Sequence, residues 1–181
     1  IVIGVIFSNI ISIDDQKIVM EKIRNYFNNL KEDVPINYGN NFIISCKNNI
    51  IYLIVIWILG LSIIGLLFNN FILFFKGFIL GFTVGSIINV YLYSGIILSF
   101  IYIFPTILFN LLIYLIAIYY ANNVSTKLFQ VLFLKKEYKF RFLIKRYVKL
   151  LAVFTVLLII SSLYETFITP MFIKLFSFLI K

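Results

Sequence analysis

Histidine is absent from this sequence and acidic residues are scarce, which removes most kinds of catalytic site. The 181 residues include no histidine, seven Asp or Glu, and one cysteine, Cys46. A serine or cysteine nucleophile usually needs a histidine base, and the His-Glu-x-x-His zinc motif cannot be formed. An aspartyl intramembrane protease needs two aspartates within spans, but Asp14, Asp15 and Asp33 all lie in one polar segment. We therefore expect no catalysis, no bound metal and no cofactor, and a single cysteine allows no internal disulfide.

Charged residues are also too few to cover a water-soluble globule. They make up 13% of the chain, and hydrophobic residues make up 62%, against about 25% and 45–50% in ordinary soluble domains. We therefore expect an all-α polytopic integral membrane protein that forms a single membrane domain over residues 1–181. The net charge of +9 then indicates orientation in the membrane, and nucleic acid is not expected as a partner.

The apolar segments predict about five transmembrane helices, the first of them truncated. Residues 1–11 are shorter than the roughly 20 residues that a crossing needs, so we expect them to be the outer half of a first span. Asn-Asn pairs at 69–70 and 122–123 are predicted to end the second and fourth spans. The other expected spans are 49–68, 74–93, 96–121 and 147–163, followed by an interfacial helix over 171–181.

The fourth apolar segment is longer than a straight crossing requires and contains Pro105. Proline removes a backbone hydrogen bond and bends a helix, so Pro105 is predicted to mark a kink. One solution is a kinked, tilted span. The other, which we favour, is a short interfacial or re-entrant piece over 96–104 followed by the span proper.

The basic residues of the connecting segments predict the orientation. Segment 13–48 has five basic and five acidic residues, whereas segment 122–147 has seven basic residues and one acidic residue. The basic loop 122–147 is therefore expected in the cytoplasm, with the N-terminus inside and the C-terminus outside. Segment 13–48 is then extracytoplasmic. Anionic lipid headgroups are the partner expected for the basic loop.

Segment 13–48 is predicted to contain an external amphipathic helix over 18–30, preceded by a capping signal at Ser12-Ile13-Asp14-Asp15. Its apolar stripe is either packed on the rest of the chain, or lies at the lipid interface, or is a docking face for a partner. The stripe consists of Val19, Ile23, Phe27 and Leu30.

Three glycines at spacing four, Gly77, Gly81 and Gly85, lie on one face of the third expected span in KGFILGFTVG. The spacing and the position of the lysine differ from those of a phosphate-binding loop. Small residues at this spacing let helix backbones approach closely in lipid. Gly60 and Gly65 are the expected opposing surface. Packing within the chain is favoured over a homodimer, which stays open.

Two ionisable residues lie close to apolar spans. Lys76 is expected to extend its side chain to the cytoplasmic interface, although a functional charge is the alternative. Glu165 is expected near the outer boundary, where it is a candidate functional carboxylate, a hydrated surface group or a partner of Lys174. Asn89 and Asn110 are expected to form hydrogen bonds between helices.

Four stretches resemble the stage II sporulation protein M family: WILGLSIIG (57–65), KGFILGFTVG (76–85), FPTILFN (104–110) and YETFITP (164–170). The resemblance runs over almost the whole chain, and the first two stretches are the most specific. The wider family often carries His or Glu just after the proline of the fourth span. This chain has Thr106 and Ile107 there, as expected of the sporulation branch.

The resemblance implies a non-catalytic subunit of the engulfment machinery in the mother-cell membrane of a sporulating bacterium. Its implied partners are stage II sporulation proteins D and P, which degrade peptidoglycan and which it would anchor and position. Segment 13–48 and the C-terminus are the expected docking elements. A transporter or permease subunit is the competing class, because a broken span such as the fourth often lines a substrate site.

Overall fold

The computed structural model describes residues 1–31, 37–103, 107–135 and 140–176, and all the regular elements in these ranges are helices. Four of them are long and apolar enough to cross a membrane, which confirms the all-α polytopic fold class. Residues 2–10, at the place of the first expected span, form a helix of nine residues. The helices are α1 (Val2–Ile10), α2 (Ile13–Lys31), α3 (Tyr38–Gly60), α4 (Gly65–Ile103), α5 (Ile107–Leu134) and α6 (Phe140–Leu175).

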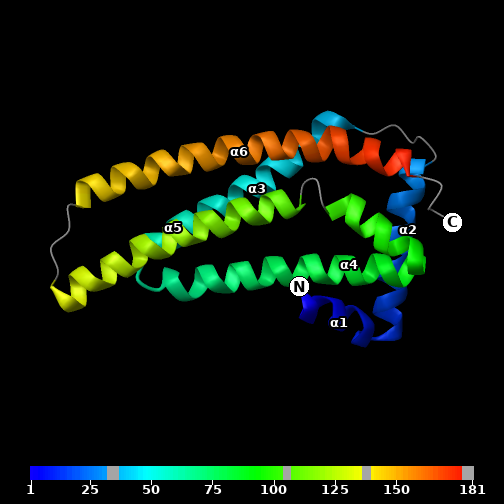
Figure 1. Cartoon of the computed structure of the whole chain (residues 1–181), viewed down its shortest axis with the longest axis horizontal. Coiled ribbons are helices and arrows are strands. Elements are labelled where there is room, and N and C mark those ends of the chain that lie inside the picture. The colour runs from blue at the N-terminus through cyan, green and yellow to red at the C-terminus, as the bar shows by residue number, and fades with distance from the viewer. Residues whose placement is uncertain (32–36, 104–106, 136–139, 177–181) are drawn as a thin grey trace.

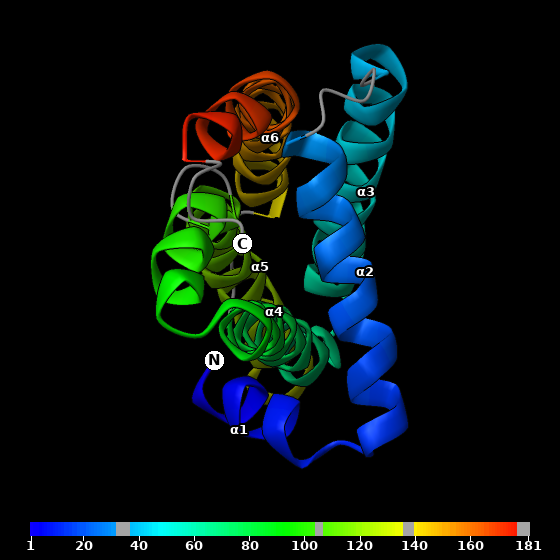
Figure 2. The same ribbon diagram turned by 90° about the vertical axis from the view of Figure 1, so that its right-hand side faces the viewer.

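The four long helices run side by side along the longest dimension of the molecule, and α2 crosses one end of them (Figures 1 and 2). The short α1 lies beside α4, with which it has the most extensive contact of any helix pair. We call the end crossed by α2 the α2 end. The opposite end, where α5 finishes and α6 begins, is called the basic end.

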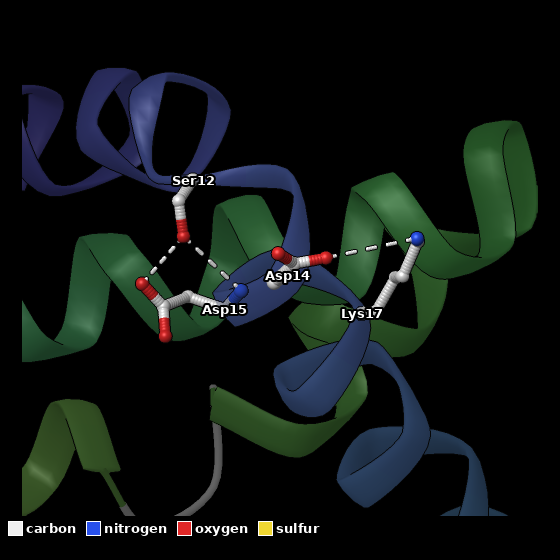
Figure 3. Close-up of polar contacts among 4 residues, drawn as sticks. All are labelled: Ser12, Asp14, Asp15 and Lys17. Carbon is white, nitrogen blue, oxygen red and sulfur yellow. Dashed lines mark hydrogen bonds and ion pairs between the residues drawn. The ribbon is translucent and has the colours of Figure 1, made fainter.

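Ser12 begins α2 as the capping signal predicts (Figure 3). The backbone N–H of Asp15 donates to Ser12 Oγ at 3.2 Å, and Ser12 Oγ donates to Asp15 Oδ2 at 2.6 Å. An exposed ion pair between Lys17 and Asp14, 3.8 Å apart, adds little stability because water screens it. The cap sets the start of α2 where the chain turns away from α1.

The turn between the first two long helices lies at residues 61–64, so the predicted turn at Asn69-Asn70 is wrong. Gly65 begins α4, although the predicted span 49–68 placed it inside the preceding helix. Ser125 of α5 donates to the carbonyl oxygen of Ser62 at 2.7 Å, and the same oxygen accepts the backbone N–H of Gly65 within the turn at 3.1 Å, so Ser125 ties the turn to α5. The Asn69 amide donates to Asn122 Oδ1 at 3.4 Å, and the Asn122 amide donates to Asn70 Oδ1 at 3.1 Å. Asn69, Asn70 and Asn122 therefore lie within helices, and their hydrogen bonds join α4 to α5.

A break inside α4 falls at Leu92, whose φ of 50° and ψ of −124° are not helical. Residues 93–103 then form a separate helical arm, which agrees with the short piece predicted at 96–104. Gly95 permits the bend, since a Cβ there would lie 2.7 Å from the Cα of Ile88. Pro105, predicted to mark the kink, lies outside the described residues.

Both predicted ends of the basic loop 122–147 need correction. Helix α5 continues through the second Asn-Asn pair to Leu134, and α6 already begins at Phe140. The predicted interfacial helix over 171–181 does not begin at residue 171, because α6 runs through Pro170 to Leu175; residues 177–181 lie outside the described residues. Proline there removes one hydrogen bond, but the neighbouring turns remain helical.

The glycine stripe of α4 faces α1. A Cβ on Gly81 would collide with the backbone oxygen of Ile1 and lie 2.7 Å from its carbonyl carbon, and a Cβ on Gly85 would lie 3.1 Å from Ser8 Cβ. Gly4 of α1 opposes them, since its Cβ would lie 2.7 Å from the amide nitrogen of Phe82. The opposing surface is therefore α1, and the expectation that Gly60 and Gly65 supply it is wrong.

Those two glycines serve other contacts. A Cβ on Gly60 would lie 2.7 Å from Ala121 Cβ on α5, and it would also collide with the Tyr147 hydroxyl of α6. A Cβ on Gly65 would collide with the backbone of Leu59 across the turn. Gly60 thus lets α3 approach α5 and α6, and Gly65 lets the chain turn tightly.

Gly81→Ala is expected to destabilise the α1–α4 contact, while Gly77→Ala is the matched control one turn away. The added methyl group at residue 81 meets backbone, whereas the nearest atom to a Cβ at residue 77 is 3.7 Å away. We expect Gly81→Ala to lower the free energy of unfolding by about 1–3 kcal/mol, measured by thermal unfolding in detergent. The control should be neutral or slightly stabilising, and equal losses in both variants would contradict the packing.

Candidate functional site

Polar side chains from four helices line a small cavity inside the bundle. Its volume is about 140 Å³, and its polar lining is Asn49 of α3, Lys76 of α4, Asn110 and Tyr114 of α5, and Glu165 of α6. We call it the Lys76–Glu165 cavity; its apolar lining is Leu80, Ile107 and Leu111. Ionisable groups within spans are costly and usually functional, so this cavity is the candidate site.

Lys76 lies in the interior of α4, not at the cytoplasmic edge predicted for it. It follows Gly65 by three helical turns, or about 16 Å at 1.5 Å per residue. Its Nζ lies 3.6 Å from the ring centroid of Tyr52 and 5.0 Å from that of Tyr114. Such cation–π contacts are worth about 0.5–2 kcal/mol each. The misplaced turn at residues 69–70 caused the error, because it shortened the helix before Lys76.

Glu165 borders the same cavity from α6. Ser45 of α3 donates its hydroxyl to Glu165 Oε2 at 2.6 Å, within the ordinary range of an O–H···O hydrogen bond. Lys76 and Glu165, expected near opposite faces of the membrane, are thus brought to one site. No ion pair joins them in the described part of the chain.

A hydrogen-bond network beside the cavity fixes three of the helices. The amide of Asn49, the central residue of α3, donates to Ser162 Oγ of α6 at 3.0 Å. The Tyr114 hydroxyl of α5 donates to Asn49 Oδ1 at 3.0 Å, and the backbone oxygen of Asn49 lies 3.1 Å from the same hydroxyl. The network holds the cavity walls in place, since each group is satisfied by another helix.

The cavity brings together two ionisable side chains, Lys76 and Glu165, and the amide of Asn110. Asn110 is 8% exposed, and its Oδ1 is buried without a hydrogen-bond partner among the described residues. Buried charges need pairing or hydration. A polar cavity of this size can hold several waters or one small polar solute between Lys76 and Glu165. The arrangement is therefore suited to holding a solvated charge pair inside the membrane.

The apolar stripe of α2, one of the candidate docking faces, is covered by the chain itself. Phe27 and Leu30 are 2% and 6% exposed, and Val19 and Ile23 are half-buried. The residues of the bundle that pack with Phe27 and Leu30 come from both arms of α4 and from α6: Ile87, Leu98 and Ile173. Because α2 crosses the bundle end, this stripe seals that end and is not free for a partner.

Sequence reasoning missed the aromatic and hydroxyl groups around the cavity. Ser45, Asn49 and Tyr52 recur at spacings of four and three, which places them on one face of α3. Asn110 and Tyr114 repeat the spacing of four on α5. These polar positions inside apolar helices were the available signal. These positions alone do not show which helices face one another.

Comparison with known protein families gives one decisive match. The family model described as stage II sporulation protein M matches residues 1–170. The chain belongs to the stage II sporulation protein M family. The matched range contains every residue of the Lys76–Glu165 cavity and all four resemblance stretches. Searches of curated proteins and of solved structures returned no match.

In this member of the stage II sporulation protein M family, the charges of Lys76 and Glu165 are expected to be energetically coupled. Lys76→Met or Glu165→Gln alone leaves the opposite charge uncompensated inside the membrane, and the double variant removes both. The double variant should lose less stability than the sum of the single losses, by about 0.5–3 kcal/mol. Unfolding in mixed detergent measures this, with exposed Lys149→Met as the control. Additive losses would contradict the coupling.

Proposed function

We propose that the chain is a non-catalytic membrane scaffold of a sporulation engulfment complex, located in the mother-cell membrane. The observation that carries the proposal is the family match over residues 1–170. Membership makes this a sporulation-related membrane protein, and the scaffold role is the finer step that we add. Its cargo would be peptidoglycan hydrolases, namely stage II sporulation proteins D and P.

The placement of α2 suggests where such partners would dock. Helix α2 lies across the α2 end of the bundle (Figure 2), and Phe27 and Leu30 of its apolar stripe are buried there. Its polar residues lie on the other face of the helix. That face is exposed and mixed in charge, and it consists of Lys17, Glu21, Lys22, Arg24, Asn25, Asn28 and Asn29. The charge asymmetry of the sequence puts it outside the cell, on the side of the wall. We therefore transfer the proposed docking surface from the buried stripe to this polar face.

Charge reversal on the polar face of α2 should separate docking from folding. Lys22→Glu with Arg24→Glu changes two exposed side chains and leaves the buried stripe intact, so the bundle should stay folded. We expect recovery of both hydrolases with the tagged protein from sporulating cells to fall about tenfold, as electrostatic complementarity at the interface is lost.

Lys145→Glu with Lys149→Glu, at the basic end, is the matched control and should leave recovery unchanged. Unchanged recovery in the α2 variant, with normal protein level and thermal stability, would count against this docking surface. Substituting Ile23 or Phe27 with Asp is a poor test, because it would detach α2 from the bundle.

A second candidate function, movement of protons or a small polar solute, is favoured by the Lys76–Glu165 cavity. Ionisable residues within spans often mark proton or ion pathways, and both Lys76 and Glu165 line this cavity. Transport would take place in the interior of the bundle, whereas the scaffold would bind its partners at the α2 end. The two proposals can therefore be tested separately.

Proteoliposomes with an internal pH-sensitive dye test the second candidate. If protons move through the cavity, vesicles with the wild-type protein should dissipate an imposed pH gradient several times faster than protein-free vesicles. Glu165→Gln should then return the rate to that of protein-free vesicles, because it removes the carboxylate that exchanges protons. Equal rates for wild-type and protein-free vesicles would exclude proton movement.

A further inference from the structure

A second pocket lies between α5 and α6 at the basic end, apart from the Lys76–Glu165 cavity. Its volume is about 470 Å³. Asn123 and Lys127 of α5 and Arg146 of α6 form its polar wall, and Phe142 and Leu150 form part of its apolar wall. Its amphipathic lining suits an occupant with both an anionic and an apolar part.

The position of the pocket along the bundle follows from its contact with the core. Tyr147, which lines the pocket, stacks on Trp57 with ring centroids 4.3 Å apart and donates to the Trp57 backbone oxygen at 3.0 Å. Trp57 is within one turn of the end of α3 at Gly60. Beyond this level α5 and α6 continue past the α3–α4 turn (Figure 1). We therefore expect the pocket to lie close to the membrane surface.

The charge around the pocket has one sign. Within the described residues 122–135 and 140–150 there are six lysines or arginines and no carboxylate. Basic pockets between helices on the cytoplasmic side are typical binding sites for anionic lipid headgroups. A free phosphate ion would use the polar wall alone, whereas a phospholipid would use both walls.

We propose that this pocket binds one anionic phospholipid, with its phosphate between Lys127 and Arg146. The Asn123 amide is a further donor for the headgroup oxygens. The acyl chains leave along the exposed ring of Phe142 and along Leu150 into the surrounding bilayer. Such a lipid would bridge α5 and α6 at the end where the chain connects them.

The fluorescence of Trp57 can report on the pocket. Trp57 is the only tryptophan in the sequence, and Tyr147, which lines the pocket, stacks on it. The protein is placed in phosphatidylcholine nanodiscs with increasing fractions of phosphatidylglycerol brominated near the headgroup, and Trp57 quenching is recorded. We expect brominated phosphatidylglycerol to quench Trp57 fluorescence at lower mole fractions than brominated phosphatidylcholine does. Lys127→Ala with Arg146→Ala should reduce this preference roughly tenfold or more.

Lys145→Ala with Lys149→Ala is the matched control, since both lysines are exposed and neither lines the pocket. This double variant also removes two positive charges, and it should keep most of the preference for brominated phosphatidylglycerol. An equal loss in the control would overturn the proposal in favour of diffuse surface attraction. Displacement of the quenching lipid by millimolar inorganic phosphate would assign the site to a free anion, and absence of any preference would exclude a lipid site. Each variant must retain the wild-type Trp57 emission maximum.

Discussion

Backbone groups inside a bilayer have no water to bind, and apolar side chains gain nothing by leaving lipid for one another. Helices in this chain must therefore be held by close backbone approach and by hydrogen bonds between side chains. Gly81 and Gly4 bring α4 and α1 into backbone contact, and Gly60 does the same for α3 with α5 and α6. Asn49 then links α3 to both neighbours through Tyr114 and Ser162. The remaining features depend on this packing.

The Lys76–Glu165 cavity follows from that packing. A lysine and a carboxylate in the interior of a bundle are stable only if the surrounding helices supply partners. Two tyrosine rings face the Lys76 ammonium group, and Ser45 binds the Glu165 carboxylate. Those partners come from helices that are distant in the sequence. The cavity is thus a property of the assembled bundle and of no single helix.

The two ends of the bundle have different chemistry, and each suits a different contact. At the α2 end, a capped amphipathic helix covers the bundle and presents a polar face of mixed charge. At the basic end, α5 and α6 extend past the other helices and carry lysine and arginine beside aromatic rings. In the proposed scaffold, the first surface would contact protein and the second would contact lipid.

Composition and local spacing predicted the fold class, the capping of α2 and a short helical piece before α5, and the four resemblance stretches indicated the family. Lys76, Glu165 and the glycine stripe were also recognisable as unusual within apolar segments. The position of Asn69-Asn70 inside a helix could be seen only in the folded chain, because that pair is satisfied by Asn122, 52 residues away from Asn70. The tertiary structure likewise decided that the α2 stripe seals the bundle and that Lys76 and Glu165 share a cavity. The sequence of one helix does not show which residue of another helix will accept its hydrogen bond or pack on its apolar face. Those partners are set when the helices assemble.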